Sequence, residues 1–326
     1  MTLFEFDKQY RDEFPIIVGI DEAGRGPLAG PVVASAVILP PNCEIEGVND
    51  SKKLSEKKRE RLFDEIYTHA LKIGVGIVHE REIDEFNILG ATVKAMKMAV
   101  AQLNSKLDIL LVDGPHLKLI NYNYKNIIKG DEKSLSIASA SIIAKVTRDR
   151  IMKNYDLVYP EYHFAKNKGY GTKAHMKAIF DFKSTPIHRK SFKPVSEYLP
   201  SIKYLKDTNK IGRLGEQFAA SGIIKLGYQI LEMNYNVHHV GEIDIIHKED
   251  DELVFSEVKT QMGSKDWGNP LDQIDERKRD KIIEASNYYI EEKEFEGNVR
   301  FDVISVQFNG TKPVIKRLKD GLSTGE

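Results

Sequence analysis

The sequence predicts an α/β protein of two domains, the first over residues 1–200 and a smaller second one over residues 201–326. Short apolar runs alternate with helical patterns through the first part, which is typical of layered α/β architectures. A polar stretch that begins with the helix-breaking Pro200 and extends to Asn209 interrupts this alternation. An αβββαββ pattern of about 115 residues follows, which is long enough to bury a core of its own.

Four strands and four helices are expected in the first domain. Pro15–Asp21 is typical of a buried strand, and Ser55–Ile73 carries apolar residues at helical spacing opposite a charged face. Ser134–Tyr155 has small residues on one face, which suits close packing on a sheet. The other strands are expected over Val32–Leu39, Ile73–Val78 and Asp108–Asp113, and the other helices over Leu89–Leu103 and Thr172–Phe182.

The second domain is expected to begin with a helix and to contain five strands. Its helices are predicted over Lys210–Leu226 and Leu271–Ile290, and its strands over Tyr228–Asn234, Glu242–His247, Glu252–Thr260, Val299–Phe308 and Pro313–Leu318.

Composition indicates a globular, core-forming chain, because 41% of the residues are apolar and 30% are charged. The single cysteine, Cys43, excludes a disulfide framework and a cysteine-rich zinc module, and it fits a reducing compartment. The first fifteen residues contain no apolar core of a signal peptide, and no apolar run reaches the roughly 18 residues of a membrane span. We therefore expect a cytoplasmic protein that does not contact a membrane.

The formal net charge of −1 conceals an uneven distribution. Residues 1–200 hold 30 basic and 26 acidic side chains, whereas residues 201–326 hold 18 and 23. Eight of the basic residues lie between Ala165 and Val195, interleaved with glycine and aromatic residues and opposed by the single acid Asp181. A charge run is usually only a solvated face, but this composition is also typical of a surface that contacts a polyanion.

Two adjacent acids, Asp21 and Glu22, stand at the end of the first predicted strand, just before the turn Gly24-Arg25-Gly26. A glycine turn after a strand is compatible with dinucleotide binding, but the two carboxylates would repel a pyrophosphate. Pro27 and Pro31 also fit poorly with a helix that opens there. The acid pair suits a divalent cation, which prefers oxygen ligands.

Asp113 ends a second apolar strand, and Asp131 precedes the long helix. Acids at strand ends are typical of α/β sites. Four converging carboxylates would repel one another, and metal ions are the usual remedy. Two cations about 4 Å apart would activate water and stabilise the leaving oxygen of a phosphodiester.

An ordered set of motifs resembles the bacterial ribonuclease HII family over roughly residues 14–199. The set consists of Asp21-Glu22-Ala23-Gly24-Arg25-Gly26, Asn49-Asp50-Ser51-Lys52-Lys53-Leu54, Val112-Asp113-Gly114, Lys129-Gly130-Asp131, Ala138–Asp149, Lys168-Gly169-Tyr170-Gly171-Thr172 and His188-Arg189-Lys190-Ser191-Phe192. Any one of these motifs is modest evidence for the family, but the complete set in this order is highly specific for it.

The resemblance implies an RNase H-like domain, a mixed sheet with flanking helices, that cleaves RNA in RNA–DNA hybrids and at single ribonucleotides embedded in duplex DNA. It implies Mn²⁺ or Mg²⁺ held by Asp21, Glu22 and Asp113, with Asp131 completing the catalytic carboxylates. The backbone of Gly24, Arg25 and Gly26 would recognise the 2′-hydroxyl, the group that distinguishes RNA from DNA. Tyr170 would lie beside the following deoxyribose, and Lys52 would contact phosphate, as would Lys53.

Other interpretations remain open for these residues. Tyr170 could be a packed aromatic, and Lys52 could belong to a solvated helix approach. Arg148 and Asp149 are expected to form a pair on a helix surface, and the four histidines at 79, 163, 175 and 188 lie at no ligand-type spacing. Two other functions are alternatives. A non-catalytic hybrid-binding module would bind RNA–DNA hybrids without cleaving them. A dinucleotide-dependent oxidoreductase would need a glycine turn that opens a helix and is not preceded by the acid pair.

A second acidic constellation lies in the C-terminal part. Glu257 and Lys259 are two residues apart on a predicted strand, so their side chains share one face. Asp244 on the preceding strand can lie beside them across a hairpin and help to hold a cation, while Lys259 would stabilise developing charge on a phosphate.

This arrangement resembles the PD-(D/E)xK nuclease core, a restriction-endonuclease-like α/β fold. With Gly212–Ala220, which contains Glu216, it specifically resembles the YraN-like family over about residues 208–320. The resemblance leaves two roles open, a DNA-processing nuclease and a nucleic-acid-binding appendage. The acidic balance of this half disfavours strong unaided DNA binding, because such affinity depends on phosphate neutralisation. Protein partners are not predicted by the sequence.

Overall fold

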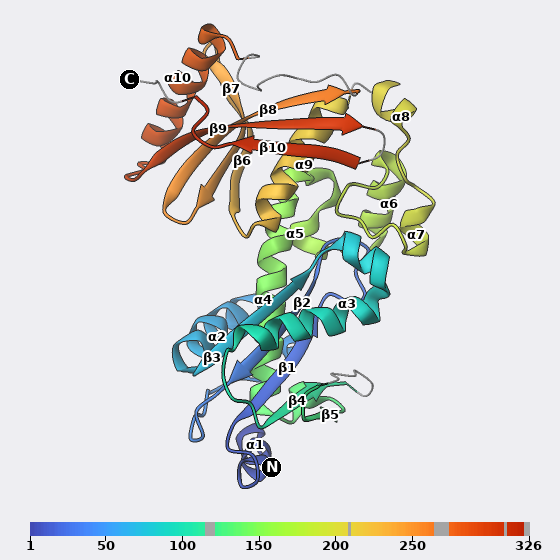
Figure 1. The fold of residues 1–326 in the computed structure, drawn as a ribbon, viewed down its shortest axis with the longest axis vertical. Coiled ribbons are helices and arrows are strands. Elements are labelled where there is room, and N and C mark those ends of the chain that lie inside the picture. The colour runs from blue at the N-terminus through green and yellow to red at the C-terminus, as the bar shows by residue number, and fades with distance from the viewer. Residues whose placement is uncertain (115–120, 208–209, 264–273, 310–311, 323–326) are drawn as a thin grey trace. The chain divides into compact units, whose positions relative to one another are not determined.

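The computed structural model describes residues 1–114, 121–207, 210–263, 274–309 and 312–322 (Figure 1). Contacts between Cα atoms divide the chain into two compact units. Unit 1 contains residues 1–152, 167–175 and 187–197, and unit 2 contains residues 153–166, 176–186 and 198–326. The domain boundary near Pro200 stays a prediction.

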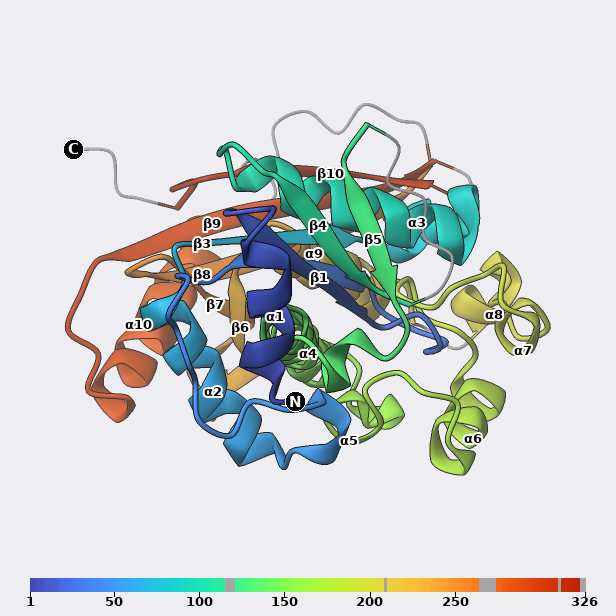
Figure 2. The ribbon, with the colours of Figure 1, turned by 90° about the horizontal axis from the view of Figure 1, so that it is seen from below.

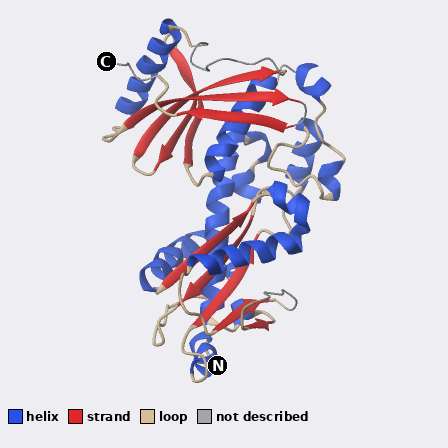
Figure 3. Cartoon of the chain, viewed as in Figure 1, coloured by secondary structure: helices blue, strands red, loops and turns tan. Residues whose placement is uncertain are grey.

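Helices and strands are interspersed along the described part of the chain, and residues 135–225 form a run that contains helices but no strand among the described residues (Figure 3). Up to residue 198 the elements are α1 (Leu3–Arg11), β1 (Ile17–Ala23), β2 (Val32–Ile38), η1 (Ser51–Lys53), α2 (Glu56–His69), β3 (Lys72–Val78), α3 (Glu80–Gln102), β4 (Ile109–Asp113), β5 (Tyr124–Ile127), η2 (Gly130–Glu132), α4 (Leu135–Val158), η3 (Pro160–Tyr162), α5 (Phe164–Asn167), α6 (Lys173–Phe182) and α7 (Lys193–Ser196). The remaining elements are α8 (Ile202–Asp207), α9 (Ile211–Lys225), β6 (Gln229–Val237), β7 (Gly241–Glu249), β8 (Glu252–Met262), α10 (Glu276–Glu292), β9 (Val299–Asn309) and β10 (Lys312–Leu318).

The sheet of unit 1 has five strands in the order β3-β2-β1-β4-β5. The first three strands pair antiparallel, whereas β4 pairs parallel with both β1 and β5. Figure 2 shows β4 and β5 beside β1 at this end of the sheet. The parallel pairing matters for the site, because it brings the C-terminal ends of β1 and β4 to the same edge.

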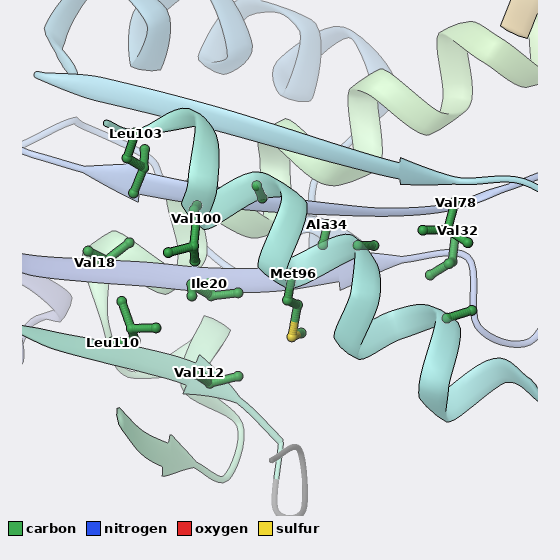
Figure 4. Packing of buried hydrophobic residues seen from close by; sticks show 14 of the residues in the cluster. Val18, Ile20, Val32, Ala34, Val78, Met96, Val100, Leu103, Leu110 and Val112 are labelled. Carbon is green, nitrogen blue, oxygen red and sulfur yellow. The ribbon is translucent and has the colours of Figure 1, made fainter. Parts of the chain in front are cut away.

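Helices cover both faces of this sheet. On one face α3 packs against β1, β2 and β4. Figure 4 shows Met96 and Val100 of α3 and Leu103 at its C-cap among Val18, Ile20, Val32, Leu110 and Val112 of the strands. On the other face α4 approaches β1 so closely that a Cβ atom at Gly19 would collide with the backbone of Ser136. The small residues predicted for this helix therefore serve close packing on the sheet.

The sheet of unit 2 has five strands in the order β10-β9-β8-β7-β6. Pairs β6–β7, β7–β8 and β9–β10 are antiparallel, and β8 and β9 are parallel. Ile282, Ala285 and Tyr289 of α10 pack on Phe255 and Val303 of the strands. The helix α9 contacts β6, β8 and β9.

The two-sheet α/β architecture confirms the predicted fold class. Each predicted strand and helix is present within a few residues, with two exceptions in extent. The helix expected from Leu89 begins at Glu80, with a kink at Asn87 where φ is 57°. The helix expected from Leu271 begins at Glu276 in the described part, since residues 264–273 lie outside it.

Besides the three 3-10 helices, five elements were missed, namely α1, β5, α5, α7 and α8, and each has nine residues or fewer. The helix α1 begins at a capping box in which Thr2 and Glu5 bond to each other's backbone amides. Its buried Asp7 accepts hydrogen bonds from Ser134, just before α4, and from Ser136 in the first turn of α4. Within the described residues, no helix combines the length and apolarity needed to cross a membrane.

Candidate active site

The strand register brings the predicted carboxylates together. Ile20 of β1 pairs with Val112 of β4, so the next residues, Asp21 and Asp113, lie side by side at the edge of the sheet. Glu22 follows on β1. Asp131 lies in η2, and the amide of the preceding Gly130 donates a 2.6 Å hydrogen bond to Asp113 Oδ1.

Burial and mutual repulsion dominate the electrostatics of this cluster. Burial raises the pKa of Asp21 well above its usual range, and the charges of Glu22 and Asp113 raise it further. Burial also raises the pKa of Glu22, although the Arg25 guanidinium opposes this effect. The pKa of Asp131 rises to about 6 because of burial and then the charges of Asp113 and Asp50. The raised pKa values of Asp21, Glu22 and Asp131 show that positive charge would be favourable at this cluster.

The available oxygen atoms fit a hard divalent cation. Glu22 Oε1 pairs with Arg25 at 3.1 Å, but its Oε2 is buried and has no hydrogen-bond partner in the described part of the chain. Asp21 Oδ1 accepts from the Glu22 amide at 2.7 Å. In the described residues, no three acidic, histidine or cysteine side chains already stand as a closed metal cage.

A pocket of about 210 Å³ opens beside Asp21 and Glu22. Its lining includes the whole of the turn Gly24-Arg25-Gly26, together with Ser51, Lys52, Ser141, Lys145, Arg148 and Tyr170. Gly24, Arg25, Gly26, Lys52 and Tyr170, which were predicted to bind substrate, therefore lie around one pocket, whereas Lys53 is not part of its lining. Lys52 Nζ is 3.9 Å from Asp131 Oδ2, which links the pocket to the fourth acid.

The second acidic constellation also converges. The antiparallel register of β7 and β8 pairs Ile245 with Ser256, which brings Asp244 next to Glu257. Glu257 Oε1 lies 2.9 Å from Lys259 Nζ and 3.2 Å from Lys278 Nζ, while Glu257 Oε2 is buried and has no hydrogen-bond partner among the described residues. Asp244 Oδ2 accepts from the Val258 amide at 2.6 Å.

Burial and Glu257 raise the pKa of Asp244 to about 7. Glu216 lies on α9 rather than on a strand, and it is close enough to Glu257 to feel its charge. Burial raises its pKa, and the charges of Glu242 and Glu257 contribute. The site thus pairs crowded acids with two lysines, a combination that can hold a cation and a phosphate.

The ribonuclease HII family model matches residues 18–195, more than half of the chain. The chain belongs to the ribonuclease HII family. It is 57% identical over 192 residues to the ribonuclease HII of Acetivibrio thermocellus, an alignment that covers 59% of this chain and 75% of that protein. It is 58% identical to the ribonuclease HII of Clostridioides difficile, with the same coverage. This membership makes the protein a ribonuclease H enzyme.

Among solved structures, the ribonuclease H2 from Pyrococcus horikoshii OT3 is 27% identical, covers 56% of this chain and 96% of its own length, and gives a TM-score of 0.49. The model of the uncharacterised protein family UPF0102 matches residues 215–306. UPF0102 is the YraN family, which has a restriction-endonuclease-like fold. The ribonuclease HII domain is therefore followed by a second domain of the predicted family.

Several residues around the ribonuclease HII carboxylates escaped the sequence analysis. Asp50 caps η1 by accepting from the Lys52 amide and adds its charge to Asp131. Ser141 of α4 hydrogen bonds with Asp21 and with Ser51, whose Oγ lies 2.9 Å away. The sequence did offer a sign of their importance, because Asp50, Ser51 and Ser141 belong to motifs that resemble the ribonuclease HII family. Lys278 gave no comparable signal, because α10 lies outside the recognised strand motifs.

One expectation about α4 is wrong. Arg148 and Asp149 were expected on a helix surface, but both are buried. Asp149 lies 2.5 Å from Lys145 and 3.9 Å from Arg59, and Arg148 extends under the glycine turn. The helix is covered on more sides than its amphipathic pattern indicates. Of the four histidines, His175 and His188 are buried and contact each other through their Nε2 atoms at 2.9 Å.

Proposed function

We propose that the protein hydrolyses the RNA strand of RNA–DNA hybrids and nicks duplex DNA at embedded ribonucleotides, as a cytoplasmic enzyme of replication and repair. The observation that carries this proposal is a pocket lined by Asp21, Glu22 and the glycine turn, with Asp113 beside Asp21 on the neighbouring strand and Asp131 close to Lys52 of the lining. The single cysteine supports a reducing compartment. The product would carry a 5′-phosphate and leave a 3′-hydroxyl.

The proposed cofactors are two divalent cations, Mn²⁺ or Mg²⁺. Asp21, Glu22 and Asp113 would hold them and Asp131 would complete the set, and the bound ions would supply Lewis acidity for phosphodiester hydrolysis. The buried, unpartnered Glu22 Oε2 and the raised pKa values of Asp21 and Glu22 support this assignment. Hard oxygen donors of this kind suit both ions.

The remaining pocket residues would bind and orient the nucleic acid. The amides of the Gly24-Arg25-Gly26 turn would recognise the 2′-hydroxyl, since glycine leaves the backbone open to close approach. Tyr170 is half exposed, and its ring lies 3.6 Å from the position a Cβ atom at Gly26 would take. This placement supports a contact with the sugar that follows the ribonucleotide. Lys52, with its exposed side chain, would contact phosphate, and so would Lys53.

The test uses a DNA duplex that holds one ribonucleotide, with Mn²⁺ and the purified full-length chain. We expect a single nick at the ribonucleotide and no cut in the matching all-deoxy duplex. An Asp21→Asn, Asp113→Asn double variant should lose the cleavage, because it removes two anionic ligands without changing side-chain size. Retained cleavage by a folded double variant would refute the assigned roles. An Asp64→Asn variant is the matched control, since Asp64 is an exposed residue of α2 in the same unit and does not line the pocket.

We propose as a second function that the C-terminal domain is a cation-dependent DNA nuclease with Asp244, Glu257, Lys259 and Glu216 in its site. The crowding of buried acids beside lysines supports catalysis over a purely structural appendage. The full-length Asp21→Asn, Asp113→Asn chain would be incubated with flap, nicked and branched DNA and Mn²⁺. Cleavage that disappears with a further Asp244→Ala change supports the nuclease. Binding without cleavage would support the appendage instead.

A further inference from the structure

The glycine turn at the pocket is held from beneath by two arginine side chains that the proposed reaction does not use. Arg148 comes from α4, and Arg189 follows α6 in the segment where His188 bridges to Ala29. Both side chains are almost fully buried, with 1% and 0% of their surface exposed. Arginine is rarely buried without a specific partner, so their contacts need an explanation.

Arg189 binds the turn through its carbonyl oxygens. Its Nη2 donates to Gly24 O at 2.5 Å and its Nη1 donates to Arg25 O at 2.9 Å. Its Nε donates to Gly30 O at 3.0 Å. The planar guanidinium group therefore joins both ends of the loop from Gly24 to Pro31.

Arg148 holds the other side of the same loop. Its Nε donates to Pro31 O at 2.9 Å and its Nη2 donates to Ala29 O at 3.1 Å. Its Nη1 donates to Lys168 O at 2.9 Å, two residues before Tyr170. Gly24 lies directly on this side chain, because a Cβ atom there would come within 2.5 Å of Arg148 Cδ. Arg148 thus connects the turn with the segment that carries Tyr170.

Neither guanidinium group forms an ion pair with a carboxylate among the described residues. Burial lowers the pKa of Arg148 to about 10 and that of Arg189 to about 9. A buried cation is costly, and here backbone carbonyls accept the hydrogen bonds of both groups, while Asp149 acts on Arg148 and Glu80 and Asp84 act on Arg189 without an ion pair. A hydrophobic side chain would fill the same space without this cost, so a packing role alone does not account for two arginines.

The carbonyl groups of the turn face the arginines, while two of its amides stay available. Among the described residues, no protein acceptor takes a hydrogen bond from the amide of Arg25 or of Gly26. In a planar trans peptide unit, the carbonyl of one residue and the amide of the next point in opposite directions. With the carbonyls of Gly24 and Arg25 bound below, the amides that follow them are directed to the other side.

We propose that Arg148 and Arg189 are positioning residues that set the selectivity for a ribonucleotide, by fixing the carbonyls of the turn so that its amides meet the 2′-hydroxyl. This inference rests on the proposed function of the turn. Lysine cannot replace either residue, because a single ammonium group cannot span several carbonyls in one plane.

The test compares Arg148→Lys, Arg189→Lys and Arg189→Ala in the full-length protein. Arg150→Lys is the matched control, since Arg150 lies on the same helix, pairs with Glu60 and has a side chain that is 47% exposed. Folded fractions are measured by circular dichroism, and kcat and KM are measured on the duplex with one ribonucleotide. We expect kcat/KM per folded molecule to fall about 100-fold in both lysine variants, which is the loss typical of a misplaced contact, and to stay unchanged in Arg150→Lys.

Chemical rescue separates positioning from folding. Millimolar guanidinium chloride should restore part of the activity of Arg189→Ala, whereas sodium chloride at the same ionic strength should not. Unchanged kcat/KM in both lysine variants would overturn the inference, and so would their failure to fold while Arg150→Lys folds. If the native protein does not distinguish the ribonucleotide duplex from the all-deoxy duplex, the proposed function fails instead. If the native protein does distinguish the two duplexes but the lysine variants are as active as it is, the role of the two arginines is refuted and the proposed function stands.

Discussion

Gly24 and Gly26 are two residues apart, but the space around them differs. Gly24 has φ of +100° and lies against the Arg148 side chain, so a side chain at this position is strained and obstructed. Gly26 has no unusual φ, and the nearest atom to an added Cβ is Tyr170 Cε1 at 3.6 Å, an ordinary contact. One glycine is needed by the fold, whereas the other is open toward the pocket.

We expect Gly26→Ala to fold with native stability and yet to cleave the ribonucleotide duplex at least tenfold more slowly, about 1.4 kcal/mol in the barrier, because its methyl group occupies the approach to the backbone. Gly24→Ala should lower both stability and activity. Thermal melting and initial rates of the two variants check this contrast. A Gly26→Ala enzyme as fast as the native one would show that the substrate does not approach this backbone.

At this scale the sequence predicted the carboxylates and the turn, since these groups are contiguous or end apolar strands. It could not predict the role of Arg148, because the arginine binds carbonyl groups, and a carbonyl is the same in every residue. It also failed for Lys278, whose contact with Glu257 depends on how α10 packs against the sheet. Tertiary contacts of this kind leave no local pattern.

Among the strands of unit 2, β7, β9 and β10 carry a buried group of charged side chains. His247 and Glu249 of β7 meet Arg300 and Asp302 of β9 and Arg317 of β10. Arg300 Nη2 is 2.5 Å from Glu249 Oε2, and Arg317 Nη2 is 2.5 Å from Asp302 Oδ2. The alternating charges stabilise one another, while the histidine beside them is kept neutral.

Burial, followed by the charge of Arg317, lowers the pKa of His247 to about 4 from 6.5. Because the unfolded chain binds this proton more tightly, stability is fully present above pH 6.5 and is lost as the pH falls toward 4. We expect the free energy of unfolding to fall by up to about 3 kcal/mol across this window from His247 alone. Urea titrations monitored by circular dichroism at several pH values measure the slope of the free energy of unfolding against pH. The His247→Gln variant should show a flatter slope, and an identical slope would contradict this origin.

The elements themselves were largely predictable, because apolar periodicity decides which residues enter a sheet or a helix face. The exceptions have physical causes. The strand β5 has a single buried residue, Ile127, at an edge, and α1 is only nine residues long, with Asp7 as its one fully buried residue. The helix α3 continues through Asn87, which has a positive φ that helical periodicity does not reveal.

For the whole chain, the division into units does not coincide with the family boundary. Residues 153–166 and 176–186 belong to the ribonuclease HII match but group with unit 2. Tyr159 Oη lies 2.9 Å from Ser221 Oγ on α9, and Arg213 of α9 pairs with Glu161. The sequence predicted a boundary from a polar stretch, and a polar stretch does not report which distant segments pack together.

A chain ended after Pro200 should therefore melt several degrees lower than the full chain, because buried groups such as the Tyr159 hydroxyl lose partners worth about 1–3 kcal/mol. Its cleavage per folded molecule should be retained, since the pocket residues all belong to unit 1. Differential scanning calorimetry and initial rates test both statements. A truncated chain that melts at the same temperature as unit 1 in the full chain would contradict the role of these contacts.

The parallel pairing of β1 with β4 has a consequence for synthesis on the ribosome. Asp21 and Glu22 leave the exit tunnel early, paired only with β2, whereas Asp113 and Asp131 follow about ninety to a hundred and ten residues later. At the 5–20 residues per second typical of translation, the delay is several seconds. A nascent chain interrupted within that interval carries the Gly24-Arg25-Gly26 turn without Asp113 and Asp131, so the carboxylate cluster is assembled only after β4 and η2 have been synthesised.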